Sequence, residues 1–131
     1  MKARFGVDVA AVNGATDAEK AAVLEGAEIV LAAAKAGVRV LTAENLKAAP
    51  KLLAAADVNA VPPSGIEGVD VFDMGKPIAG SSILGVGALA IGNVKYQTES
   101  GLFRRMIEAD EVLALDFRDA FTLARTLVPE L

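Results

Sequence analysis

Four places along the chain carry residue types that could take part in chemistry. Gly85–Gly87 precedes a segment of helical periodicity, so backbone could approach a flat ring closely and free helix N–H groups could meet an acceptor. Asn59 combines a donor and an acceptor in one side chain. Lys95 follows small residues and could balance an anionic substrate or a developing charge. Asp70 and Asp73 are close enough in sequence to act as an acid–base pair.

Each of these residues also has a simpler structural interpretation. The glycines of Gly85–Gly87 could ease strand-to-helix packing, and they lack the third glycine of the dinucleotide fingerprint. Asn59 could form an Asx turn at the start of a proline loop. Lys95 could be an ordinary solvated lysine, which composition alone favours. Asp70 and Asp73 lie in a glycine-rich loop, and we interpret them as solvated loop residues.

Composition excludes several other classes of chemistry. The 131 residues include no His and no Cys, which excludes Ser-His-Asp and Cys-His catalysis, disulfides, and imidazole or thiolate metal ligands. A net charge of −4 argues against a nucleic-acid partner. The longest apolar run, residues 29–34, is far shorter than the roughly 18 residues that span a membrane. With no signal-peptide pattern, we expect a cytoplasmic protein without a membrane partner.

Segments of strand and helix character alternate along the chain. We predict strands at Val7–Val12, Glu28–Ala33, Leu52–Ala56 and Ser82–Val86. Helices are predicted at Asp17–Glu25, Thr42–Ala49, Gly87–Ala109 and from the N-cap Asp116 onward, with a loop over Asn59–Gly80. This alternation predicts an α/β fold in one domain, residues 1–131. We expect a three-layer, mostly parallel sheet of about four strands with helices on both faces, a partial Rossmann or flavodoxin-like arrangement.

Two long blocks make the chain resemble a known family. Ala56–Asp70 contains the unusual run Asn-Ala-Val-Pro-Pro-Ser-Gly-Ile, and Gly85–Thr98 is the second block. Both closely resemble the C-terminal part of NAD(P)-dependent methylene-tetrahydromethanopterin dehydrogenase, and the likeness extends over the whole chain. The family's enzymes belong to one-carbon metabolism. They transfer hydride between NADP or NAD and a pterin substrate, using a Rossmann-type domain that follows a pterin-binding portion.

The resemblance implies roles for a small set of residues. Lys95 matches a position that makes it the candidate catalytic residue, and no metal ligand is implied. The implied cofactor-binding residues lie in the turn past the cofactor, near the nicotinamide end, or facing nicotinamide and pterin: Ala33, Ala34, Asn59, Gly85, Gly87, Ala88 and Leu89.

The resemblance further implies that this chain holds only the later part of the nucleotide domain. The first βαβ unit, whose Gly-rich turn grips the pyrophosphate, is expected upstream, so we expect the isolated chain to be inactive. Two alternatives stay open: a truncated or engineered folding module without catalytic function, and a flavodoxin-like mononucleotide-binding module.

The missing first unit also affects the expected sheet. We expect Val7–Val12 to move in beside Glu28–Ala33, giving four parallel strands in chain order. The rival outcome is a homodimer through an exposed sheet edge.

Overall fold

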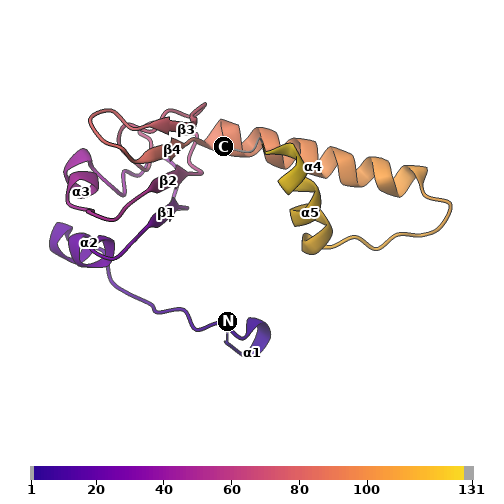
Figure 1. Cartoon of the computed structure of the whole chain (residues 1–131), viewed down its shortest axis with the longest axis horizontal. Helices are drawn as coiled ribbons and strands as arrows, with labels where there is room; N and C mark the ends of the chain where they lie inside the picture. Colours follow the sequence, from indigo (N-terminus) through magenta and orange to yellow (C-terminus); the bar gives the residue numbers. More distant parts are fainter. Residues whose placement is uncertain (1, 129–131) are drawn as a thin grey trace.

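The computed structural model describes residues 2–128 as a small sheet with a helical arm (Figure 1). The α/β class with a mostly parallel, four-stranded open sheet is confirmed. In chain order the elements are α1 (Lys2–Phe5), α2 (Asp17–Leu24), β1 (Ile29–Ala32), α3 (Ala43–Lys47), β2 (Ala54–Asp57), β3 (Met74–Pro77), β4 (Leu84–Val86), α4 (Ala88–Glu108) and α5 (Phe117–Leu127).

The sheet has the order β1-β2-β4-β3. Three strands are parallel, with Ile29 opposite Ala54 and Ala54 opposite Leu84. The three parallel strands, β1, β2 and β4, confirm the strands predicted at Glu28–Ala33, Leu52–Ala56 and Ser82–Val86. β3 pairs antiparallel with β4 and falls inside the predicted loop Asn59–Gly80, so that segment is not a loop throughout. The sequence Met-Gly-Lys-Pro lacks the apolar alternation of a strand, and only pairing with β4 makes it one.

The predicted strand Val7–Val12 is wrong. These residues are exposed and form no ladder, although Val12 lines a cavity of about 210 Å³ together with Val30 and Leu31 of β1. The expected sheet of four parallel strands in chain order is therefore also wrong. Alternating valines suit a strand, but a strand exists only where backbone groups find partners, and this segment extends away from the sheet toward α1 (Figure 1).

Local capping explains where the helices begin. Thr16 and Glu19 form a reciprocal capping box that starts α2, and Thr42 caps α3 as predicted, with Asn45 as its reciprocal partner. Asp116 accepts from the backbone N–H of Arg118 and so starts α5. α3 ends at Lys47, two residues before the predicted end at Ala49.

The two faces of the sheet are unequally covered. One face packs beneath α2, α3 and the loop after β2, and its core includes Leu24, Leu46, Ala55 and Ile66. On the opposite face, Ile29 and Leu31 of β1 are 72% and 64% exposed. The nearly continuous apolar run of residues 29–34 would suit a strand buried on both faces, but β1 is covered on one face only. Beyond the sheet, α4 extends as a long arm and α5 folds back against it (Figure 1). None of the described helices combines the length and apolar character needed to cross a membrane.

Candidate functional site at the carboxyl edge of the sheet

The strand register brings most of the predicted site residues to one edge. Ala32 lies opposite Asp57, and Ala56 lies opposite Val86, so β1, β2 and β4 end side by side. Ala33 and Ala34, Asn59, and Gly87 to Leu89 follow these strand ends directly. In an open parallel sheet this edge is where ligands bind.

The end of β1 presents small, exposed side chains. Ala33 and Ala34 are both exposed, and the carbonyl of Ala32 accepts a hydrogen bond of 3.1 Å from the backbone N–H of Val58. Val58 on the neighbouring strand end is itself exposed. These three exposed apolar side chains therefore follow two neighbouring strand ends. We call Ala33, Ala34 and Val58 the edge ledge.

A buried carboxylate organises the end of β2. Asp57 is only 2% exposed, and its Oδ1 accepts from the backbone N–H of Asn59 at 2.9 Å. Its Oδ2 accepts from the N–H groups of Gly65 at 2.6 Å and Ile66 at 3.2 Å. Sequence reasoning assigned Asp57 no role. The available signal was a carboxylate ending an apolar strand, with Asn and Gly following nearby.

Asn59 is committed to the loop that it begins. Its side chain accepts from the N–H of Val61 at 3.0 Å and donates to the carbonyl of Pro63 at 3.2 Å. The residue is 7% exposed. The interpretation as an Asx turn is confirmed, and both side-chain heteroatoms are engaged within the loop.

Gly85 lies within β4 and Gly87 follows it, and at both positions a side chain would meet close neighbours. A Cβ on Gly85 would lie 3.2 Å from the Ile78 side chain. A Cβ on Gly87 would lie 2.0 Å from the carbonyl oxygen of Asp70 and 2.5 Å from that of Val71. The packing interpretation is therefore confirmed, because backbone crosses where the side chain at position 87 would be.

The same crossing closes the N-terminus of α4. The carbonyl oxygen of Val71 accepts from the N–H groups of Leu89 at 2.8 Å and Ala90 at 3.2 Å. The expectation that these helix N–H groups are free to meet an acceptor on a ligand is wrong for both residues. Gly87 is the N-cap residue of α4 and has no side chain that could accept from the helix N–H groups, so the carbonyl of Val71 accepts from them instead.

The carboxylates of that loop are structural. Asp73 is buried and accepts from the N–H of Asp70 at 2.9 Å, while Asp70 is exposed and accepts from the N–H of Phe72 at 2.9 Å. The interpretation as solvated loop residues is correct for Asp70 and wrong for Asp73. Within residues 2–128, no cluster of three or more acidic side chains could hold a metal ion.

Lys95 lies apart from the other predicted residues. It follows Ala88 by seven positions on α4, which places it about 10 Å further along the helix. Its side chain is 72% exposed, and Nζ lies 3.7 Å from Oε1 of Glu99. The structure does not bring it together with Asn59 or the edge ledge.

The edge fits one part of a dinucleotide better than another. The edge ledge offers small apolar side chains to a flat ring such as nicotinamide. A pyrophosphate needs several free backbone N–H groups, and two at the start of α4 are already bonded to Val71. At the start of α4, the N–H groups of Leu89 and Ala90 are therefore not available to a phosphate.

Comparison with known proteins identifies relatives of this chain. No protein-family model matches the chain. The NAD(P)-dependent methylenetetrahydromethanopterin dehydrogenase of Methylorubrum extorquens is 55% identical over 124 residues, which cover 95% of this chain and 42% of that protein. The chain is homologous to a portion of this dehydrogenase. The resemblance drawn from its two sequence blocks is thereby confirmed.

A second relative matches a similar share of the chain. The bifunctional protein MdtA of Methylorubrum extorquens is 32% identical over 124 residues, again 95% of this chain and 42% of that protein. The chain thus spans less than half the length of the dehydrogenase and of this second protein.

Proposed function

We propose that the chain supplies one wall of the NAD(P) site in a methylenetetrahydromethanopterin dehydrogenase. The observation that carries the proposal is the edge ledge at the carboxyl ends of neighbouring strands, in a chain 55% identical to part of such an enzyme. The nicotinamide ring would lie against the edge ledge, near Gly87, Ala88 and Leu89. Hydride transfer belongs to the cofactor, so the protein has to align two reacting carbons and exclude water.

The substrate would be a methylene-tetrahydromethanopterin, in one-carbon metabolism, and the cofactor NADP or NAD. A chain without His or Cys can serve such a reaction, because no protein nucleophile is required. Lys95 would contribute long-range positive charge rather than a contact at the ring, since it lies two helical turns beyond Ala88. Asn59 would act through the loop that it holds.

The phosphate grip would come from outside this chain. The closed N-terminus of α4 supports this division, and the residues would form a truncated Rossmann-type domain lacking its first βαβ unit. The isolated chain would then be inactive. A mononucleotide-binding module would need the same phosphate grip at these strand ends, so the closed helix favours the dehydrogenase.

A chimera tests this proposal. The chain replaces the matching 124 residues of the 55% identical dehydrogenase, and the formation of reduced NAD and NADP is followed with the pterin substrate. Ala33→Leu, which fills the edge ledge, should raise KM for the cofactor by about tenfold or more. Ala48→Leu is the matched control, because Ala48 is also an exposed alanine but lies after α3, away from this edge. Equal effects of both substitutions would contradict the placement of the ring.

A further inference from the structure

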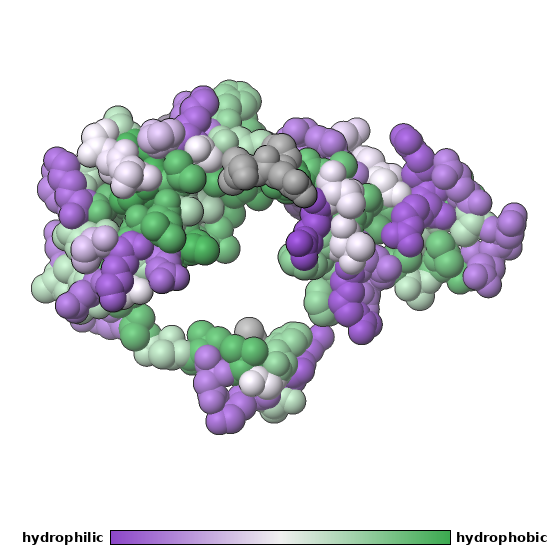
Figure 2. All heavy atoms as spheres, in the orientation of Figure 1, coloured by the Kyte–Doolittle hydropathy of each residue, from purple (hydrophilic) through white to green (hydrophobic). Residues whose placement is uncertain are grey.

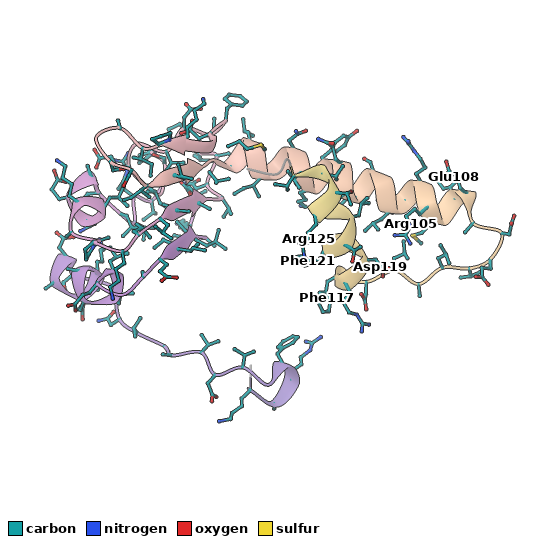
Figure 3. All side chains as sticks on the ribbon, viewed as in Figure 1. Arg105, Glu108, Phe117, Asp119, Phe121 and Arg125 are labelled. Atoms are coloured by element: carbon teal, nitrogen blue, oxygen red, sulfur yellow. The ribbon has the colours of Figure 1, made fainter. Side chains whose placement is uncertain are left out.

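One aromatic residue lies in a loop at the carboxyl edge of the sheet. Phe72 comes two residues before β3, and Met74, which begins β3, lies opposite Val86, which ends β4. The loop therefore shares its edge with the ends of β1, β2 and β4. Phe72 is 68% exposed. The other aromatic residues of the chain belong to α1, α4 or α5, and Figure 3 shows Phe117 and Phe121 on α5.

The backbone around Phe72 is held by two carboxylates. Oδ1 of Asp70 accepts from the N–H of Phe72 at 2.9 Å, and Oδ2 of Asp73 accepts from the N–H of Asp70 at 2.9 Å. The N–H of Asp73 donates to the carbonyl of Asp70 at 3.0 Å and closes the turn. Because these bonds already fix the backbone, binding of a ligand to Phe72 would cost little further ordering of the chain.

The same turn is fastened to the start of α4. The carbonyl of Val71 accepts from the N–H of Leu89 at 2.8 Å, and the N–H of Gly87 donates to the carbonyl of Asp73 at 2.8 Å. The nicotinamide ring is proposed to lie near Gly87 and Leu89. These bonds therefore hold Phe72 close to the proposed position of the reacting end of the cofactor.

The edge around this turn is apolar and wider than one ring. In Figure 1 the parallel strands point toward the hollow beside the arm, and Figure 2 shows hydrophobic residues on that side of the sheet. Adjacent strands lie about 4.8 Å apart, so in the order β1-β2-β4 the turn lies about 10 Å from the end of β1. A nicotinamide ring on the edge ledge leaves the β4 side of the edge for a second ring.

Hydride transfer requires a second ring beside the nicotinamide. The two reacting carbons must approach to about 3–3.5 Å, and a fused pterin, being larger than nicotinamide, extends past it. The planar part of a pterin has a π face that stacks on an aromatic side chain. We propose that Phe72 is a substrate-binding residue whose ring stacks on the pterin at the β4 side of the carboxyl edge. This proposal rests on the proposed function, because that function supplies the pterin substrate.

Substitution of Phe72 in the chimera tests the proposal. Phe72→Ala should raise KM for the pterin substrate by about fivefold or more, and leave KM for NAD(P) within about twofold, because one stacked ring is lost. Phe72→Tyr should keep KM for the pterin near its original value, whereas Phe72→Leu, which is apolar but has no π face, should raise it. Phe103→Ala is the matched control, because Phe103 is 64% exposed on α4 but lies about 20 Å beyond Leu89.

Three results would overturn the assignment of Phe72. An unchanged KM for the pterin in Phe72→Ala would remove the residue from the substrate site. A raised KM for NAD(P) alone would make it a cofactor contact. A KM for the pterin that Phe72→Leu preserves as well as Phe72→Tyr would replace stacking with an ordinary apolar contact.

A binding measurement separates this inference from the proposed function. Tetrahydromethanopterin without its one-carbon group is titrated into the chimera and followed by calorimetry. Binding that Phe72→Ala weakens, in a chimera without turnover, would refute the proposed function and leave the stacking standing. Turnover with equal binding to both forms would do the reverse, and a folded chimera that binds no pterin would overturn the stacking. If the chimera does not fold, NMR of the isolated chain decides, because Phe72 ring protons that the same pterin fails to shift would also overturn it.

Discussion

Asp57 and Gly65 are fitted to each other at the end of β2. The N–H of Gly65 donates to Oδ2 of Asp57 at 2.6 Å, and a Cβ at position 65 would lie 2.9 Å from Oδ1. The buried carboxylate thus accepts from the backbone N–H of residue 65 and leaves no room for a side chain at that position. This pair closes the proline loop against the strand end and fixes the geometry of the candidate site.

Replacing Asp57 should destabilise the chain strongly. Asp57→Ala leaves the N–H groups of Asn59, Gly65 and Ile66 without their acceptor, at a cost of about 3 kcal/mol. Denaturant unfolding measures this change. Asp110→Ala, at an exposed position, should alter the free energy of unfolding by less than about 0.5 kcal/mol. Similar losses for both variants would refute the role of Asp57.

Alanine substitutions at Gly87 and Gly92 should change the stability of the protein in opposite directions. Gly87→Ala forces a Cβ to 2.0 Å from the carbonyl oxygen of Asp70 and should cost at least about 3 kcal/mol. Gly92→Ala adds a Cβ with nothing within 4 Å inside α4, and should stabilise the protein by about 1 kcal/mol. Thermal unfolding of the two variants compares them. A mild effect at Gly87 would mean that the loop yields easily.

Local signals predicted the helix starts, and non-local pairing set the rest of the fold. Thr16 and Asp116 each cap a helix through atoms within three residues, so their sequence spacing was sufficient. β3 exists only because β4 lies beside it, and its sequence carries no strand pattern. Val7–Val12 has that pattern and finds no partner. The alternation of side chains therefore predicts which face a strand would bury, and not whether a neighbour is available.

Asn59 should behave as a structural residue of the isolated chain. Asn59→Ala removes the bonds to Val61 and Pro63 and should lower the free energy of unfolding by about 2 kcal/mol. If Asn59 served only to bind the cofactor near its nicotinamide end, as the resemblance implies, its loss would leave the free energy of unfolding nearly unchanged. Chemical denaturation decides between them. A loss below about 0.5 kcal/mol would restore the ligand-orienting role.

The stabilisation of α5 by its N-cap residue Asp116 should be lost at acidic pH. Hydrogen bonds from the Arg118 side chain, and to a smaller extent from the Arg118 backbone N–H, lower the pKa of the Asp116 carboxyl to about 2. Because the folded pKa lies below the usual 3.8, the cap stabilises α5 above about pH 4 and is lost as the pH falls toward 2. An NMR titration of the Asp116 carboxyl should give this low midpoint. Arg118→Met should move it upward, and an unchanged midpoint would refute the cause.

The candidate site was partly predictable from the positions of its residues relative to the predicted strands. Residues that directly follow strands, such as Ala33, Asn59 and Gly87, reach one edge once the strands are parallel. The closure of α4 by Val71 could not be read from sequence, because the acceptor is a backbone carbonyl of a distant loop. The position of Lys95 depends on the helical rise, which carries it beyond the edge.

Turnover with and without the rest of the dehydrogenase is the most direct measurement of the central claim. With the pterin substrate and NAD or NADP, the isolated chain should form no reduced cofactor, since its α4 N-terminus is closed and offers no phosphate grip. The chimera should form reduced cofactor under the same conditions, and Ala33→Leu should weaken its use of the cofactor. Turnover by the isolated chain, or a folded chimera without turnover, would contradict the claim that this chain supplies one wall of an NAD(P) site.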